Sequence, residues 1–252
     1  TIESLEAAAS LEDYRHRNPF VAYLNSFHCR DAGNENALAE SQARSKFFGL
    51  IHVPHPVANT IERMLFSEDK RHIILTGHAG DGKSTIAMEL YKRFKKLPTE
   101  EPLSSALKRR EDLSVDGTAI TFIKDFSEWS ENERMTLLEE MLSENSPRFF
   151  LVTNTGTLLN TFRDYERKAG GNWAHLESEI LKKIDSATPS ELPFRDTMFS
   201  LINLSMIDNL GVAEQILQRM IAPERWRGCS ALDCHEKCPI IRNVRLILDN
   251  ED

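Results

Sequence analysis

The sequence has few cysteines, no long apolar run and no surplus of basic residues. Its 252 residues include four cysteines, and this sparse usage favours a reducing compartment over a disulfide framework. Charged residues interrupt the apolar stretches, so no segment approaches the roughly 20 residues that a membrane-spanning helix needs. No signal peptide is visible either. We therefore expect a cytoplasmic protein with no membrane partner.

The charge balance also limits the partners that this chain can hold by itself. A formal net charge of −8 argues against a broad basic surface for nucleic acid. A basic cluster at residues 108–110 is interpreted as a solvated face. The chain begins at Thr1 and ends soon after an apolar helical pattern, so we expect a segment of a longer protein. DNA contact is then expected through other proteins of a complex rather than through this segment.

The most specific motif is the glycine-rich stretch TGHAGDGKSTIA at residues 76–87. It fits G-x-x-x-x-G-K-[ST], the loop that wraps a nucleoside triphosphate, with the fixed positions at Gly77, Gly82, Lys83 and Ser84. An apolar run rich in β-branched residues precedes the motif, and a helical pattern follows it. This setting favours a P-loop over a glycine-rich turn with a chance lysine.

Each residue type in this loop has a physical role in holding phosphate. Glycines have no Cβ, so backbone N–H groups can approach phosphate oxygens closely, and the following helix adds its unpaired amides. We expect Lys83 to bridge the β- and γ-phosphates and Ser84 to place its hydroxyl on Mg²⁺. The expected ATP-binding residues are Gly77, His78, Ala79, Gly80, Asp81, Gly82, Lys83, Ser84 and Thr85.

Two carboxylates follow the next apolar run, TAITFIKDFSEW at residues 118–129. Asp125, at the expected strand end, is predicted to hold Mg²⁺ through water. Glu128 is predicted to orient or deprotonate the attacking water. Two alternatives stay open. Asp125 can be a turn residue at the strand end, and Glu128 can be an acid at the start of a capped helix.

A third polar position follows the apolar stretch RFFLV at residues 148–152. Asn154 stands at the expected carboxyl end of this strand, where open α/β sheets bind ligands, and is predicted to contact the γ-phosphate or its water. An equal alternative is that it caps the next helix. Arg148, Arg163 and Arg242 are candidate partners of the γ-phosphate, and the sequence does not choose among them.

The wider pattern alternates apolar strands with helices, which is typical of a parallel α/β sheet. We predict an α/β fold: a P-loop NTPase with a parallel sheet flanked by helices and followed by a small helical lid. Little strand signal lies between Leu97 and Gly117, so a strand there is expected to be missing or short. The expected strands are residues 72–77, 119–125, 148–154 and 197–205, and the expected parts are a helical segment (1–45), an ATPase core (46–206) and a helical lid with a cysteine cluster (207–252).

The cysteine cluster of the last part has the spacing C-x₄-C-x₃-C, formed by Cys229, Cys234 and Cys238. This spacing is close to that of a zinc knuckle but is one ligand short, and His28 or Cys29 are the residues that the fold would have to supply. The alternative is three reduced cysteines that pack a compact loop. ATP and Mg²⁺ are thus the expected cofactors, and zinc is left as an alternative.

The order strand, GHAGDGKS, helix, AITFIKD, helix, LVTNT, helix, LINLS and helical lid resembles the AAA+ and STAND ATPases over roughly residues 46–248. In those families the helix and loop before the P-loop help to hold adenine, which implies this role for residues 47–66. The D-x-x-E spacing of Asp125 and Glu128 is closer to STAND proteins, because AAA+ proteins place the second acid directly after the first. A simple hexameric motor is therefore not expected.

Three stretches carry a narrower resemblance: IKDFSEWSENERMTLLEEML, FFLVTNTGTLL and CSALDCHEKCPIIRN. Together they resemble the ATPase component of bacterial DNA phosphorothioation-dependent restriction systems, and other antiviral ATPases share this organisation. The resemblance implies an ATP-dependent switch that works with two partner proteins of a defence complex, which restrict DNA lacking the mark. Alternatives are a nucleotide-gated scaffold without significant hydrolysis and a small-molecule kinase.

Overall fold

The computed structural model of the chain describes residues 18–25, 45, 47–99, 101, 103–232 and 237–249. The chain divides into two compact units, each described here by itself. The larger unit spans residues 54–99 and 107–208, and the smaller unit takes residues 1–53, 100–106 and 209–252. Most of the helical segment expected over residues 1–45 lies outside the described residues.

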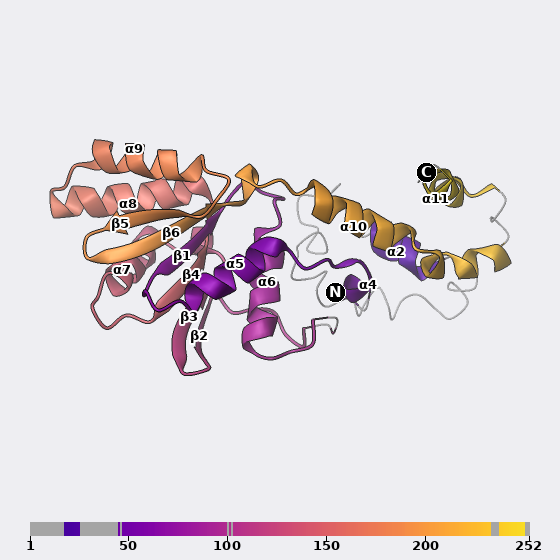
Figure 1. Cartoon of the computed structure of the whole chain (residues 1–252), viewed down its shortest axis with the longest axis horizontal. Helices are drawn as coiled ribbons and strands as arrows, with labels where there is room; N and C mark the ends of the chain where they lie inside the picture. The colour runs from indigo at the N-terminus through magenta and orange to yellow at the C-terminus, as the bar shows by residue number, and fades with distance from the viewer. Residues whose placement is uncertain are drawn as a thin grey trace. The chain divides into compact units, whose positions relative to one another are not determined.

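The larger unit is built on one six-stranded sheet with the order β2-β3-β4-β1-β6-β5 (Figure 1). The four central strands, β3, β4, β1 and β6, run parallel. The two edge strands are antiparallel, β2 to β3 and β5 to β6. The bounds are β1 His72–Thr76, β2 Arg110–Val115, β3 Thr118–Ile123, β4 Arg148–Val152, β5 Ser190–Phe194 and β6 Thr197–Asn203.

The α/β class predicted from the sequence is confirmed, but the prediction of a parallel sheet is wrong at both edges. Each edge strand is a hairpin partner with one exposed face, so its apolar signal is weak: β2 buries only Leu113 and Val115, and β5 only Leu192 and Phe194. The β2–β3 turn is Asp-Gly with positive φ at both residues (49° and 83°), as a type I′ turn requires. This dipeptide was the missed signal between Leu97 and Gly117.

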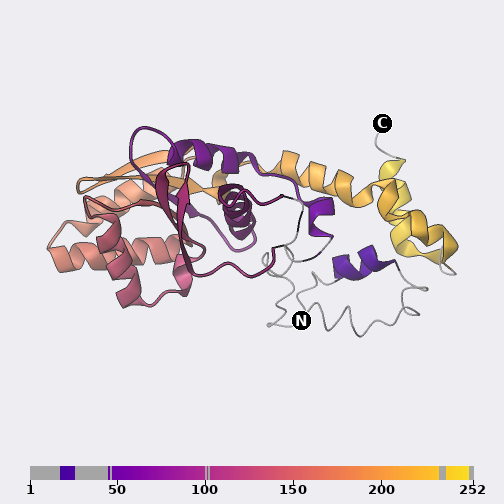
Figure 2. The ribbon, with the colours of Figure 1, turned by 90° about the horizontal axis from the view of Figure 1, so that it is seen from below.

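Helices cover both faces of the sheet. On one face lie α7 (Glu131–Met141), α8 (Thr155–Ala169) and α9 (Trp173–Ile184), and the last two lie side by side in both views (Figures 1 and 2). Their apolar residues form one core with the sheet, in which the Phe162 ring lies 5.0 Å from that of Phe194 and 5.6 Å from that of Phe199. Such ring pairs each add about 0.5–1.5 kcal/mol beyond their buried area.

The other face of the sheet carries α5 (Pro56–Leu65) and α6 (Lys83–Phe94). Because side chains alternate along a strand, Phe122 and Phe150 point to this face, and Tyr91 of α6 packs with its ring centroid 5.9 Å from that of Phe122. The buried carboxylate of Glu89 on α6 accepts a hydrogen bond from the His55 amide at 3.1 Å, where α5 begins. This contact fixes the two helices to each other.

The smaller unit has a separate core that joins early and late parts of the chain. Its helices are α2 (Pro19–Asn25), α4 (Phe48–Ile51), α10 (Leu210–Ile221) and α11 (Pro239–Leu248), and the last two match the helical patterns expected after Ile207. The core consists of Phe20, Tyr23, Ile221, Trp226, Cys229, Ile241 and Val244. In the described parts of both units, we find no helix with the length and apolarity to cross a membrane.

Candidate functional site

The glycine-rich loop joins the end of β1 to the start of α6, at the carboxyl edge of the parallel strands. The strand before it is fully buried and lies between β4 and β6. Gly77, Gly80 and Gly82 have φ values of 148°, 90° and 90°, a region in which side chains with a Cβ are strained. The strand, loop and helix therefore follow one another as the sequence predicts.

The start of α6 differs from the other helix starts of the larger unit. At the starts of α5, α7, α8 and α9, a capping side chain accepts a hydrogen bond from a backbone amide of the helix. These acceptors are His55, Ser130, Asn154 and Asn172, respectively. In contrast, α6 begins after Gly82, and no described side chain caps it. Its first amides and the positive end of its dipole are thus left to an acceptor from outside the helix.

Lys83, the first residue of α6, is half-buried against the loop. Its Nζ donates to the carbonyl oxygens of Gly77 at 3.0 Å and His78 at 2.6 Å. Burial lowers the pKa of Lys83, and the negative charges of Asp81 and Asp125 act in the opposite direction. The structure thus brings Asp125 close enough to act on the loop lysine through its charge.

Asp125 and Asn154 follow β3 and β4 and are linked through one serine. Asp125 accepts the Ser127 amide at 2.8 Å and so caps the short helix η3 (Phe126–Glu128). Asn154 Nδ2 donates to Ser127 Oγ at 2.8 Å, while Asn154 Oδ1 accepts the Thr157 amide at 2.7 Å and caps α8. Both residues therefore hold the structural positions that the sequence left open, side by side at the carboxyl edge.

Glu128 is exposed at the end of η3 and is not part of the next helix. The helix α7 begins at Glu131, and its capping box is formed by Ser130 and Glu133. The Glu128 carbonyl accepts a hydrogen bond from Arg109 at 3.0 Å. Arg109 is exposed, as the sequence predicts for this basic cluster, and it lies at the same sheet edge because β2 starts opposite the end of β3.

The loop has one further partner that sequence reasoning missed, Ser205. It follows β6 in the short helix η4 (Leu204–Met206), and its Oγ accepts the His78 amide at 3.0 Å and donates to Asp81 Oδ2 at 2.5 Å. Burial acts to raise the pKa of Asp81, but the hydrogen bonds from Ser205 and His78 and the charge of Lys83 leave it lowered. The available signal was a polar residue after a buried strand, the same signal that identified Asn154.

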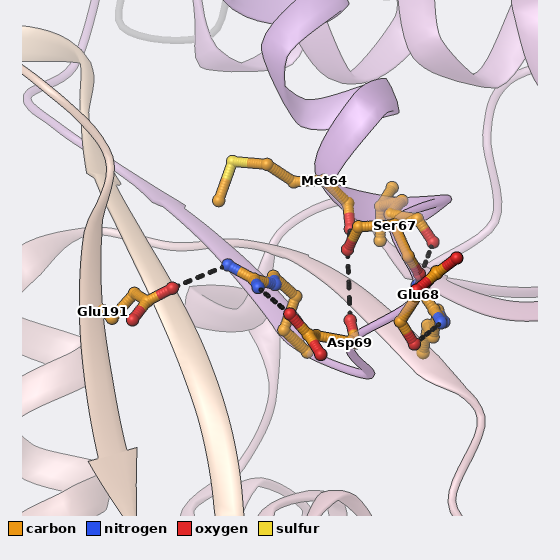
Figure 3. A network of polar contacts seen from close by, with 8 residues as sticks. Met64, Ser67, Glu68, Asp69 and Glu191 are labelled. Carbon is orange, nitrogen blue, oxygen red and sulfur yellow. Dashed lines mark hydrogen bonds and ion pairs between the residues drawn. The ribbon is translucent and has the colours of Figure 1, made fainter.

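Of the three candidate arginines, Arg148 lies at the opposite edge of the sheet. It begins β4, which runs parallel to β1, and its Nη1 donates to the carbonyls of Leu65 at 2.7 Å and Ser67 at 2.6 Å. Figure 3 shows Ser67, Asp69 and Glu191 of this amino-edge network. The expected γ-phosphate role is therefore wrong for Arg148.

The other two arginines are placed differently. Arg163 on α8 pairs with Asp164 at 3.1 Å, and Arg242 lies on α11 in the smaller unit.

The cysteine cluster is described only in part. Cys229 is buried in the smaller unit, where Asn18 Nδ2 donates to its Sγ at 3.1 Å, and Cys238 precedes α11. Cys234, His28 and Cys29 lie outside the described residues. Among the residues that are described, no three His, Cys, Asp or Glu side chains are grouped to hold a metal ion. The zinc alternative stays a prediction.

No family model, curated protein or solved structure matches the chain.

Proposed function

We propose that the larger unit is a P-loop ATPase core that binds Mg·ATP at the carboxyl edge of its sheet. One observation carries this proposal: a G-x-x-x-x-G-K-S loop, bent by three glycines with positive φ, leads from a buried central strand into a helix that no described side chain caps. These are the requirements for a backbone cradle around a triphosphate.

The residues around this loop fit the ligand. Amides of the loop and of the first turn of α6 would donate to phosphate oxygens, and Lys83 would supply a fixed positive charge to the β- and γ-phosphates. Ser84, exposed at the start of α6, and Asp125 are the residues that would hold Mg²⁺. When bound, Mg²⁺ neutralises charge on the phosphates.

Two further residues of the chain are proposed to act in hydrolysis. Glu128 would orient or deprotonate the attacking water, since it is the exposed carboxylate that follows Asp125 on the same short helix. Asn154 would act through Ser127, because its side chain ties the end of β4 to the segment that carries both acids. Hydrolysis by this chain alone is expected to be slow.

The placement of the candidate arginines supports slow hydrolysis. Of the candidate arginines, Arg148 lies at the amino edge and Arg163 is paired with Asp164, so neither is committed to the γ-phosphate. An arginine supplied in trans increases the rate about 10³–10⁵-fold where it is used. We propose that the protein is the ATP-dependent switch of a bacterial DNA restriction complex of the phosphorothioation-dependent type, or of another antiviral defence complex, in which partner proteins complete the site and contact DNA.

A nucleotide-gated scaffold is the second candidate, and the exposure of Glu128 favours it. A general base is held within hydrogen-bond reach of its water, whereas the Glu128 side chain is exposed and, among the described contacts, only its backbone carbonyl accepts a hydrogen bond. In a scaffold, Mg·ATP would hold the loop, and Glu128 would take no part in chemistry.

Single-turnover and steady-state ATPase assays distinguish the two functions. The isolated chain is expected to turn over far below several times per second, and the reconstituted complex with DNA is expected to be faster. Hydrolysis at several per second by the chain alone, unchanged by partners or DNA, would contradict the switch. Binding without any hydrolysis in the reconstituted complex would instead support the scaffold.

A further inference from the structure

Ser205 is held in place by contacts with the end of the sheet, in addition to its contacts with the glycine-rich loop. The side chain of Asn203, the last residue of β6, accepts the Ser205 amide at 3.2 Å. The same side chain donates through Nδ2 to the Ile184 carbonyl at the end of α9, at 3.0 Å. The position of Ser205 is therefore fixed by β6 and α9 rather than by the loop itself.

From this position the Ser205 hydroxyl connects two points of the loop. It accepts the His78 amide at 3.0 Å, lies 3.0 Å from His78 Nδ1 and donates to Asp81 Oδ2 at 2.5 Å. Asp81 Oδ2 also accepts the His78 amide at 2.6 Å. A hydroxyl bound to a carboxylate is a strong hydrogen bond, so this cluster closes the first turn of the loop.

The packing around this cluster depends on a glycine. A Cβ placed on Gly77 would lie 2.7 Å from Asp81 Oδ2 and 3.3 Å from Ser205 Oγ. A Cβ at Gly77 would therefore force the Asp81 carboxylate out of its present position in this cluster. The absence of a Cβ at Gly77 serves contact with Ser205 as well as the approach of a ligand.

Ser205 also stands next to the point where the chain leaves the larger unit. The larger unit ends at Asp208, three residues beyond Ser205, and the smaller unit resumes at Asn209. We term residues 204–208 the connector. The chain runs from β6 through the connector into α10, so a ligand that alters the loop alters the environment of the connector through one hydroxyl.

We propose that Ser205 is a positioning residue that couples the glycine-rich loop to the connector, so that nucleotide binding and order in the connector strengthen each other. This inference rests on the proposed function. The physical reason is linkage: a contact that favours the binding-competent loop raises affinity, and the ligand then stabilises that contact by the same factor. A loop held in one arrangement also loses less freedom on binding.

The test uses the whole chain with two matched serine variants. Ser205→Ala removes the connecting hydroxyl. Ser205→Thr keeps this hydroxyl, and the position is only partly buried, which leaves room for the added methyl group. Ser200→Ala is the control, because Ser200 lies on β6, the strand that leads to Ser205, and its buried hydroxyl has no hydrogen-bond partner among the described residues. The two readouts are Mg·ATP affinity and hydrogen exchange of the connector amides with and without Mg·ATP.

We expect Ser205→Ala to weaken Mg·ATP binding about 5- to 20-fold and to abolish the protection that Mg·ATP gives the connector in the wild type. Ser205→Thr and Ser200→Ala are expected to keep both properties. Asp81→Asn should weaken binding in the same way, and adding Ser205→Ala to it should cause little further loss, because the two residues act through one contact.

The outcomes separate this inference from the proposed function. Unchanged affinity, or unchanged protection of the connector, in a folded Ser205→Ala variant overturns the coupling. If the wild type binds Mg·ATP and Lys83→Ala does not, while Ser205→Ala behaves as the wild type, only the coupling fails. A wild type that does not bind Mg·ATP overturns both. Should Ser205→Ala not fold, Asp81→Asn decides the question with the same two readouts.

Discussion

The two edges of the central sheet hold charged residues in different ways. At the amino edge, Arg148 donates to the carbonyls of Leu65 and Ser67, and Arg71 pairs with Glu191 at 2.9 Å. The first contacts tie β4 to the end of α5, and the ion pair ties the start of β1 to β5. At the carboxyl edge, Lys83 is held by two carbonyls of its own loop instead.

The difference shows which charges serve the fold. The amino-edge arginines satisfy carbonyls and acids of neighbouring elements, so their loss disrupts packing between those elements. The carboxyl edge gathers a left-handed glycine loop, a helix start that no described side chain caps, and two acids, Asp125 and Glu128, in the segment that follows β3. That arrangement suits an anionic ligand with a metal ion. We therefore expect mutations to separate into effects on function and effects on stability.

The largest effect is expected from Glu128→Gln at the carboxyl edge. A general base contributes about 10²–10⁴-fold in rate, so turnover should fall by this factor while Mg·ATP affinity stays unchanged. Single-turnover hydrolysis and equilibrium titration measure the two quantities, preferably in the reconstituted complex. Glu131→Gln, at the start of α7, is the matched control. Equal turnover in Glu128→Gln and the parent would leave Glu128 without a role in chemistry.

Asp125→Asn is expected to affect binding rather than turnover alone. Removing the charge weakens a charge-assisted contact to the hydrated metal, so affinity for Mg·ATP should fall about 10- to 100-fold. Affinity for ATP measured in EDTA should change much less. Asparagine keeps the oxygen that caps η3, so a thermal melt checks that the fold is intact. A loss of affinity that is the same with and without Mg²⁺ would argue against a metal role.

The amino edge provides the opposite prediction. Arg148→Ala leaves the Leu65 and Ser67 carbonyls without their donor, and we expect a loss of about 2 kcal/mol in the free energy of unfolding. Urea unfolding measures this loss. Mg·ATP affinity under native conditions should match that of the wild type. If Arg148→Ala weakened nucleotide binding and spared stability, the assignment of the two edges would be reversed.

A pH-dependent effect of similar size is expected from His72, the first residue of β1. Its buried ring accepts the Phe149 amide, bonds the Met141 carbonyl, and burial lowers its pKa to about 4. The unfolded state therefore binds the proton more tightly, so stability is full above pH 6.5 and is lost as the pH falls toward 4. Between pH 7 and pH 5 this loss is about 2 kcal/mol.

Urea unfolding at several pH values measures the contribution of His72. His72→Gln should flatten the pH dependence, whereas His175→Gln at an exposed site should keep it. An identical pH dependence in His72→Gln and the parent would show that the ring is not the titrating group.

The sequence predicts the loop well because the loop is local. Three glycines, a lysine and a serine within eight residues are enough to predict the conformation of the loop, and the strand before them is buried throughout. The edge strands β2 and β5 were not predicted because only alternate residues of each strand are buried, which gives a weak apolar pattern. The Asp-Gly turn before β3 was nevertheless visible in the sequence. The position of Arg148 was recoverable too, since the first residue of a parallel strand lies at the amino edge.

Ser205 could not be found in this way. Its contacts with His78 cross 127 residues of sequence, and no local pattern states that β6 lies next to β1. Strand order decides which strand ends meet the loop, and this order is a tertiary property. The caps formed by Asp125 and Asn154 are local contacts that the sequence already offered as alternatives. The hydrogen bond from Asn154 to Ser127, which links the ends of β3 and β4, exists only in the folded chain.

Calorimetric titration of Mg·ATP into the wild type, Lys83→Ala and Lys96→Ala tests the central claim most directly. Lys96 is exposed after the far end of α6 and pairs with Asp116, so it serves as a matched control for the loss of one lysine. We predict that the wild type and Lys96→Ala bind with equal affinity and that Lys83→Ala loses about 10- to 100-fold or more with its melting temperature preserved. Undiminished binding by a folded Lys83→Ala variant, or no binding by the wild type, would contradict a nucleotide site at the carboxyl edge.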